Sequence, residues 1–229
     1  MRILAIDTSC GAASAAVVDG APRQTLARLS APMTQGHAEA LGPMIKDVMA
    51  QIEGGFPSLG AVAVAVGPGS FTGIRIGLAM ARAIGLTLEV PVIGVSTLVA
   101  FAAPLLDEPT PGVIVSAIDA RHGSVYFQVF ESSGRPLFEA RVATLRDAVR
   151  AIGAGPARLA GDAAVALAAE GQRAGLVCDA SGAAAYPDIA AIARIGLASN
   201  PADWPPRPLY VKPPDAKPAS GVAIKRREG

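Results

Sequence analysis

Cysteine and histidine are scarce in this sequence, which holds two of each in 229 residues. Cys10 and Cys178 lie far apart, and neither sits in a metal-binding spacing or a disulfide framework. We therefore expect a reducing compartment, the cytoplasm. Aromatic residues are also few, at 4%, and the many alanines fit core and surface alike, which weakens the periodic signal of individual segments.

Long apolar runs and an excess of charge are absent as well. Asp7 cuts the N-terminal apolar run after four residues, which excludes the h-region of a signal peptide. No stretch reaches the roughly 18 uninterrupted apolar residues of a membrane span, so no membrane partner is expected. Basic residues number 20 and acidic residues 19, a net charge of +1. Without a global field to attract a polyanion, the body of the chain is not expected to hold nucleic acid alone.

The apolar content, 51%, is ample for the core of one large or two small domains. The most informative segment is GPGSFTGIRIG at residues 67–77, between the alternating apolar run 61–66 and a helix-like stretch that reaches Leu88. Such a turn exposes amides at a helix N-terminus, where an anion is favoured. The spacing matches neither the dinucleotide fingerprint nor the P-loop. An anion site and a tight structural turn are both compatible with this pattern.

The helix that follows carries small residues every four positions, at Gly73, Gly77, Ala81 and Gly85. They form one stripe that another backbone can approach closely. Because each glycine costs a helix about 1 kcal/mol relative to alanine, the stripe needs a packing reason. One interpretation is burial between the chain's own sheet and a neighbouring helix, and the other adds a partner subunit. Arg75 and Arg82 are seven residues apart and share a narrow face.

A second amphipathic helix is predicted over residues 34–52. Pro43 lies inside it, so the helix kinks there or starts afresh with Gly42 as its cap. Its apolar face ends in a histidine, which the pattern favours as a hydrogen-bonded residue at an interface edge over a metal ligand. That face follows helical spacing through His37, Leu41, Met44, Ile45, Val48, Met49 and Ile52.

The chain also contains an internal repeat. A strand, an Ile-Asp pair, three residues, a glycine and a second strand occur at residues 3–18 and again at 113–130, 112 residues apart. Each copy is followed by helices and strands, with strands predicted at 59–66 and 92–95 in the first, and helices at 145–152 and 163–170 around a strand at 157–160 in the second. This order predicts two ββ(β)αβα units. His122 lies in the second hairpin turn, where a surface position is expected. We expect a first domain at 1–103, a proline-marked linker at 104–112 and a second, degenerate domain at 113–200. The proline-rich segment 201–229, with its basic end Lys225-Arg226-Arg227, is expected to wrap the surface or be disordered.

Two duplicated units with an acid closing the first strand resemble the actin, Hsp70 and sugar-kinase ATPases, an RNase H-like α/β architecture that binds nucleotide between its halves. Within it, the motifs IDTS at 6–9, HAEAL at 37–41, PMI at 43–45, GPGSFTGIRIG at 67–77 and DAR at 119–121 resemble the TsaB (YeaZ) family. The resemblance covers most of the chain and is strongest over residues 1–130.

That resemblance implies a non-catalytic subunit of the machinery that threonylcarbamoylates N6 of the adenosine beside the anticodon, in tRNAs that read codons starting with A. Its catalytic paralogue, TsaD, has a His-x-x-x-His metal pair on the helix matching residues 34–52, whereas this chain has His37 followed by Leu41. The second ligand is absent, and a lone imidazole is a poor metal site. No metal site and no catalytic residue are therefore expected.

The resemblance also implies the partners. A TsaD-like subunit docks on the two helices, a TsaE-like ATPase is recruited, tRNA is contacted only indirectly, and a homodimer forms when the partner is absent. Interface residues are expected at His37, Leu41, Met44, Ile45, Val48, Gly73, Arg75, Gly77, Met80, Ala81 and Ile84. No resident cofactor is implied beyond weak ATP or ADP binding, for which the candidates are Asp7, Ser9, Gly67, Gly69, Ser70 and Thr72.

Two enzymatic alternatives stay open from the residues. The first is an ATP-binding transferase or small-molecule kinase of this fold, which the short Gly161-Asp162-Ala163 counterpart to the first glycine turn disfavours. Asp7 and Ser9 would then close a hairpin turn through side-chain to backbone bonds. The second is a peptidase with Ser70 as nucleophile, for which the sequence identifies no base or orienting acid.

Overall fold

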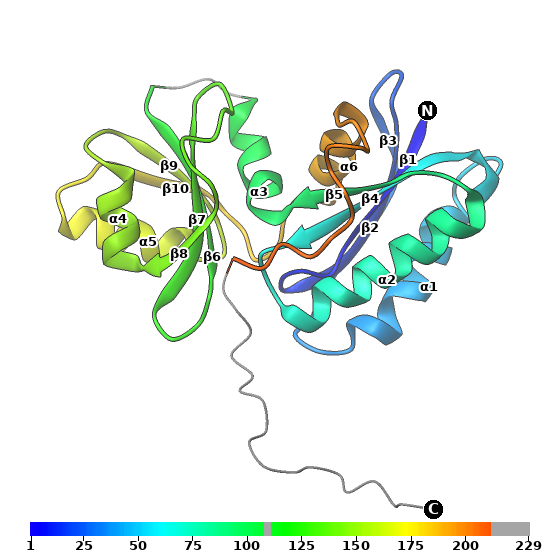
Figure 1. The fold of residues 1–229 in the computed structure, drawn as a ribbon, viewed down its shortest axis with the longest axis horizontal. Coiled ribbons are helices and arrows are strands. Elements are labelled where there is room, and N and C mark those ends of the chain that lie inside the picture. The colour runs from blue at the N-terminus through cyan, green and yellow to red at the C-terminus, as the bar shows by residue number, and fades with distance from the viewer. Residues whose placement is uncertain (108–110, 212–229) are drawn as a thin grey trace, which may run out of the picture.

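The computed structural model describes residues 1–107 and 111–211, which form two lobes that each contain one five-stranded sheet (Figure 1). The first lobe is built from β1 Arg2–Asp7, β2 Ala12–Asp19, β3 Gln24–Pro32, α1 His37–Met49, a 3₁₀ turn Phe56–Ser58, β4 Leu59–Gly67, α2 Phe71–Leu88, β5 Val92–Ser96 and α3 Thr97–Leu106. The second is built from β6 Val113–Asp119, β7 Ser124–Glu131, β8 Arg141–Thr144, α4 Leu145–Ile152, β9 Ala157–Gly161, α5 Ala164–Arg173, β10 Cys178–Ala183 and α6 Ile189–Ala198.

The two sheets have the same topology. Their strand orders are β3-β2-β1-β4-β5 and β8-β7-β6-β9-β10. In each, the first strand pairs antiparallel with the second and parallel with the fourth. The predicted duplication and α/β fold class are confirmed, because every strand of one lobe has a counterpart at the same place in the other.

Most of the predicted elements are present, and four were missed. The predicted hairpins, the strands at 59–66, 92–95 and 157–160 and the helix at 145–152 correspond to observed elements. The sequence pattern does not predict β8, β10, α3 or α6, and it predicts the third strand of each unit only as an optional element. The predicted linker begins at Pro104, but Pro104 lies inside α3, which continues to Leu106. Residues 108–110 of that linker and 212–229 of the tail, including Lys225-Arg226-Arg227, lie outside the described residues.

The third helix of each lobe packs against the opposite lobe. Helix α6 lies on β1, β2 and β4 of the first sheet, where Ile189, Ile192 and Ala193 join Ile3 and Ala63 in one buried cluster. Helix α3 extends over β6 and β9 of the second sheet, with Leu98 and Phe101 packed against Ile118 and Ala160. The predicted boundary at residue 200 is therefore corrected, because the chain returns to the first lobe at α6. This exchange joins the lobes through apolar burial.

Helix α1 covers the opposite face of the first sheet, packing on β2 beside α2. The predicted interface face of this helix is turned into the core: Leu41 and Val48 are 0% exposed, and His37, Met44 and Ile45 are buried with them. Their assignment to a partner contact is corrected, because the apolar stripe of an amphipathic helix has been satisfied by the chain's own sheet.

The glycine stripe of α2 also faces the chain's own sheet. A Cβ at Gly73 would lie 1.9 Å from the carbonyl oxygen of Thr8, and one at Gly77 would lie 2.8 Å from Thr8 Oγ1. Ala81 is 0% exposed in the same core. The first of the two interpretations of the stripe is therefore correct, and Gly73, Gly77 and Ala81 are removed from the predicted interface. Of the described helices, α2 alone is long and apolar enough for a membrane span, and 33% of its residues are buried in the chain's own fold.

The segment after α6 crosses back over the first lobe as an extended C-terminal strap, residues 203–211. Backbone bonds join Gly94 N to Trp204 O (2.9 Å) and Leu209 N to Val66 O (2.8 Å). Arg82 donates to the carbonyl of Pro206, and Arg75 Nε donates to Tyr210 Oη at 3.2 Å. The predicted wrapping is confirmed for these residues. Arg75 is thus an anchor for the strap, and its predicted place in the partner interface stays a prediction.

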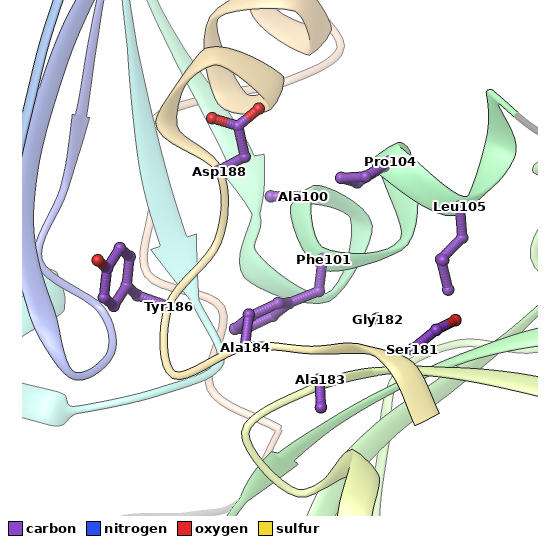
Figure 2. A pocket seen from close by; sticks show the side chains of 10 residues that line it. All are labelled: Ala100, Phe101, Pro104, Leu105, Ser181, Gly182, Ala183, Ala184, Tyr186 and Asp188. Atoms are coloured by element: carbon purple, nitrogen blue, oxygen red, sulfur yellow. The ribbon is translucent and has the colours of Figure 1, made fainter. Parts of the chain in front are cut away.

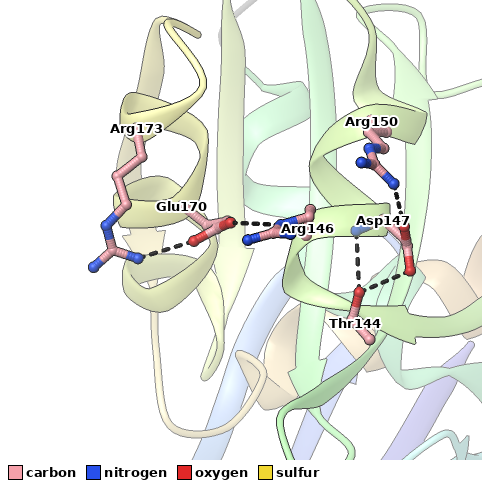
Figure 3. A network of polar contacts seen from close by, with 6 residues as sticks. All are labelled: Thr144, Arg146, Asp147, Arg150, Glu170 and Arg173. Carbon is pink, nitrogen blue, oxygen red and sulfur yellow. Dashed lines mark hydrogen bonds and ion pairs between the residues drawn. The ribbon is translucent and has the colours of Figure 1, made fainter.

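The outer helices of the second lobe carry a local network of charge (Figure 3). Thr144 caps α4 by accepting from Asp147 N at 3.2 Å, and Arg150 pairs with Asp147 at 3.0 Å. Glu170 on α5 pairs with Arg173 at 2.9 Å and with Arg146 at 3.8 Å. All three arginines are more than two-thirds exposed, so these pairs contribute little stability and leave the lobe without a free basic patch here.

Adding a methyl group at Gly73 should test the close packing of α2. Gly73→Ala forces a Cβ against a backbone oxygen that no side-chain rotation can move, and we expect the free energy of unfolding to fall by about 3 kcal/mol. Urea denaturation measures this change. The matched control is Gly155→Ala, where nothing lies within 4 Å of the added atom and stability should stay within about 0.5 kcal/mol. Equal effects at both positions would contradict the packing.

Candidate functional site

The tip of the β1–β2 hairpin, residues 7–11, is the structural centre of the predicted nucleotide loop. Asp7 Oδ1 accepts from the backbone N–H of Ser9 at 2.8 Å, which closes the turn as an Asx-type motif. Thr8 Oγ1 donates to the carbonyl of Gly73 at 2.6 Å, and Thr97 Oγ1 donates to Ser9 Oγ at 3.2 Å. The turn is therefore held by α2 on one side and by α3 on the other.

Asp7 is the most perturbed acid of this tip. Its side chain is 0% exposed, and among the described residues its Oδ2 has no hydrogen-bond partner. Burial raises the pKa of Asp7 above its ordinary value, against the lowering effect of the bonds from Ser9. Burial, assisted by the charges of Asp7 and Asp162, also raises the pKa of the Cys10 thiol well above its ordinary range. Cys10 is therefore a protonated thiol and a poor nucleophile.

The glycine turn directs its donors at the hairpin tip. Ser70 N donates to Ser9 O at 2.7 Å, and Ser70 Oγ caps α2 by accepting from Gly73 N at 3.2 Å. A Cβ at Gly69 would lie 2.2 Å from Ser9 O, so glycine is needed for this approach. The structure brings Asp7, Ser9, Gly69 and Ser70 together, with Gly67 under the strap and Thr72 exposed. The segment is thus a structural turn. Its backbone N–H groups, which an anion would need, already donate to other groups of the same chain.

The second lobe repeats the acid but adds negative charge where a second phosphate loop would lie. Asp162 Oδ1 accepts from Asp119 N at 2.8 Å, and Asp119 Oδ1 accepts from Arg121 N at 2.8 Å. Burial raises the pKa of Asp162, with the Asp119 charge acting in the same direction. His122 is exposed at the hairpin tip, as expected. The distance between His37 Nε2 and the carbonyl oxygen of Cys10 is 3.4 Å. Within the described ranges, no group of three His, Cys, Asp or Glu residues could hold a metal ion.

The side of α2 that the chain leaves uncovered carries small and apolar residues, which we name the α2 outer face, with Arg75 and Arg82 exposed beside them. Leu86 is 82% exposed there, and Ala79, Ala83, Thr72 and Thr87 are exposed around it. Met80 and Ile84, two predicted interface residues, are half-buried and pack against the core cluster that includes α1. The sequence missed this face because its small residues show no apolar periodicity. The α2 outer face consists of Thr72, Ile76, Ala79, Ala83, Leu86 and Thr87.

Two hollows lie near the junction of the lobes. The smaller, of about 210 Å³, lies between α3 and the segment that joins β10 to α6, with Phe101 and Tyr186 at its sides (Figure 2). Its one acid, Asp188, is already bonded to Ala190 N (3.0 Å) and paired with Arg194 (3.3 Å). The larger, of about 690 Å³, lies between β7, the N-terminal end of α3 and the C-terminal strap.

Comparison with known proteins places this architecture. A family model described as TsaD: tRNA N6-adenosine threonylcarbamoyltransferase matches residues 31–192. The TsaB protein of Escherichia coli is 36% identical over 131 residues, which are 57% of this chain and 55% of that protein. The solved structure of YeaZ from Pseudomonas aeruginosa is 26% identical with a TM-score of 0.66, covering 91% of this chain and 99% of that one.

An inorganic polyphosphate/ATP-glucomannokinase from Arthrobacter, 11% identical, shares the fold with a TM-score of 0.50 and covers 86% of this chain and 98% of that one. The two duplicated lobes therefore define an actin-like, sugar-kinase-like α/β protein. Within that class the chain belongs to the TsaB (YeaZ) family. It spans about half the length of the first curated relatives that it matches.

The buried Asp7 should make stability depend on pH in a defined direction. Because its folded-state pKa is raised, the native state binds more protons than the unfolded state above pH 3.8, and stability falls as pH rises towards the folded-state pKa. Asp7→Asn removes the ionisable group and so removes this loss of stability. We expect the difference in melting temperature, variant minus wild type, to be about 2–4 °C larger at neutral pH than at low pH.

Asp19 provides the control of opposite sign. A backbone bond from Ala21, aided by the N-terminus and Arg2, lowers its pKa, so its stabilisation is present above the unfolded-state pKa and is lost at low pH. Asp19→Asn should match the wild type in acid and melt below it at neutral pH. Thermal denaturation of the three proteins from pH 3 to 8 measures both effects, and a difference for Asp7→Asn that does not change with pH would contradict the assignment.

Proposed function

We propose that this chain is a non-catalytic scaffold subunit in the threonylcarbamoylation of N6 of the adenosine next to the anticodon, in tRNAs that read codons starting with A. It acts by binding a TsaD-like catalytic paralogue and helping to recruit a TsaE-like ATPase, in the cytoplasm, with tRNA contacted only indirectly. The name of the relative, tRNA threonylcarbamoyladenosine biosynthesis protein TsaB, supports the pathway.

The α2 outer face is the observation that carries the scaffold role. This face presents alanine, threonine, isoleucine and leucine to solvent, with Leu86 82% exposed. The two exposed cations beside it, Arg75 and Arg82, are bound to the C-terminal strap. A TsaD-like partner has the same fold class, since its family model matches most of this chain, and small residues allow a second helix to approach closely.

Two observations support the non-catalytic assignment. Leu41, four residues after His37, is fully buried in the core and supplies no ligand. Ser70, the residue required by the peptidase alternative, caps α2 through its hydroxyl, and none of its described hydrogen bonds involves a histidine or an acid.

Charged residues on the α2 outer face should break the complex without unfolding the chain. Ala79→Arg and Ala83→Arg place a guanidinium at exposed positions, and we expect the affinity for a TsaD-like partner to fall by roughly tenfold or more. Co-purification of the co-expressed pair measures the loss. The matched control is Val165→Arg on α5, a 64% exposed position of the second lobe, which should retain the complex. Loss of the complex with Val165→Arg, or its retention with both α2 variants, would contradict the proposed interface.

Reconstitution tests the absence of catalysis separately. The purified chain should give no modified tRNA alone, and modification should appear when TsaD, TsaE and a source of threonylcarbamoyl-adenylate are added. Product formed by the chain without TsaD would instead favour the transferase alternative. Self-association in the absence of the partner should also decrease in Ala79→Arg, as measured by light scattering, because the homodimer would use the same face.

A further inference from the structure

An exposed group of two aromatic rings and an arginine lies where the C-terminal strap meets the N-terminal end of α2. Phe71 is 42% exposed and Tyr210 44% exposed, and their ring centroids are 5.6 Å apart. The guanidinium carbon of Arg75 lies 3.6 Å from the centroid of the Phe71 ring. Large rings normally seek burial, and tyrosine and arginine are enriched among the residues that dominate the energy of protein interfaces. We name Phe71, Arg75 and Tyr210 the Arg75 cluster.

The side chain of Arg75 is held in one orientation by the chain itself. Its Nε donates to Tyr210 Oη at 3.2 Å while its guanidinium lies over Phe71. Tyr210 is fixed in turn, because the preceding residue, Leu209, donates its backbone N–H to Val66 O at 2.8 Å. A long side chain that is already ordered loses less conformational entropy when a partner binds to it. The strap therefore pre-organises an exposed cation at one end of α2.

The unused end of the Arg75 guanidinium has the geometry of a carboxylate site. Within the part of the chain that the structure describes, Arg75 forms no ion pair and its guanidinium bonds to Tyr210 alone. With Nε in use, Nη1 and Nη2 remain as two parallel donors, which match the two oxygens of a carboxylate. Thr72 and Ile76 of the α2 outer face are adjacent in sequence to Phe71 and Arg75. A helix packed on that face can therefore bring an acid to this end of Arg75.

Charge decides between the possible occupants of this site. The α2 helix of a second copy offers no acid, since Arg75 and Arg82 are the only charged residues between positions 71 and 88. Arg82 is exposed as well, so a symmetric contact through α2 gathers like charges without a carboxylate between them. A polyanion such as RNA needs many cations, whereas the chain has a net charge of +1 and the cluster adjoins apolar residues. An acidic protein partner fits the site best.

We infer that Arg75 receives a carboxylate from a helix of the catalytic partner, and that this pairing favours the complex with that partner over a second copy of the chain. The inference rests on the proposed scaffold function, because it assigns a chemistry to the partner of the α2 outer face. Phe71 and Tyr210 are positioning residues that act through Arg75. Since the pair lies at the rim of the interface, it contributes to specificity and to the rate of association.

Arg75→Gln should separate the two associations. We expect its affinity for the purified TsaD-like partner to fall roughly fivefold, mainly through slower association, and the loss to shrink as salt rises from about 50 to about 200 mM. Self-association of the same variant, followed by light scattering, should stay unchanged or become stronger, because a like charge is removed. The matched control is Arg141→Gln, which removes an exposed guanidinium 4.3 Å from the Phe138 ring in the second lobe and should change neither affinity. An equal loss of both associations in Arg75→Gln would contradict the inference.

Tyr210→Phe tests the positioning role, because it keeps the ring and removes only the acceptor of the Arg75 bond. We expect a roughly twofold loss of affinity for the partner that disappears in the Arg75→Gln background. A loss of the same size in both backgrounds would show that Tyr210 acts independently of Arg75.

Changing each acid on the partner's docking helix to its amide should identify one whose effect is lost in the Arg75→Gln background. The absence of such an acid, or unchanged partner binding in Arg75→Gln, would overturn the inference, as would binding of tRNA by the chain alone that depends on Arg75. Ala79→Arg separates this failure from that of the scaffold proposal. If Ala79→Arg breaks the complex and Arg75→Gln does not, the α2 outer face remains the interface and the carboxylate assignment alone is wrong. If neither variant affects the complex, both proposals are wrong.

Discussion

The close approach of α2 to the β1–β2 hairpin is the contact on which the rest of the first lobe depends. Gly69 and Gly73 admit the carbonyl oxygens of Ser9 and Thr8 to positions that a Cβ would occupy. The amide of Ser70 and the hydroxyl of Thr8 are consumed in holding this contact. The glycine-rich turn thus serves internal packing in this chain. With its glycine face directed into the core, α2 turns a different face to solvent, formed by small and apolar residues with Arg75 and Arg82 beside them.

The exchange of third helices gives the two lobes a common core. Helix α6 completes the cover of the first sheet, and α3 completes that of the second. Opening the lobes would expose apolar surface on both sheets at once, and each Å² exposed costs roughly 25 cal/mol of free energy. This arrangement favours a fixed inter-lobe geometry, which is compatible with the proposed scaffold role.

The sequence predicted the elements whose patterns are local, and it missed those defined by distant contacts. The hairpins at Asp7 and Asp119, β4, α2 and α4 follow from alternation, glycine turns and periodicity. Helix α6 is an apolar segment that packs on β1, β2 and β4, more than 100 residues earlier in the sequence. No local pattern could therefore predict where it packs. The same limit affected the site. Periodicity located the apolar faces of α1 and α2 correctly, but it cannot distinguish burial against the chain's own sheet from burial against a partner.

The proposed interface is the less hydrophobic face of α2, and its composition argues for how it would be used. A strongly apolar outer face would drive aggregation of the free chain, while a charged face would resist close helix packing. Alanine and threonine avoid both, since they cost little in water and allow backbones to approach. Arg75 and Arg82 border this face, and their bonds to Tyr210 and to the carbonyl of Pro206 hold the two long cations against the strap. A partner helix can therefore approach the alanine and threonine positions without first displacing a free cation.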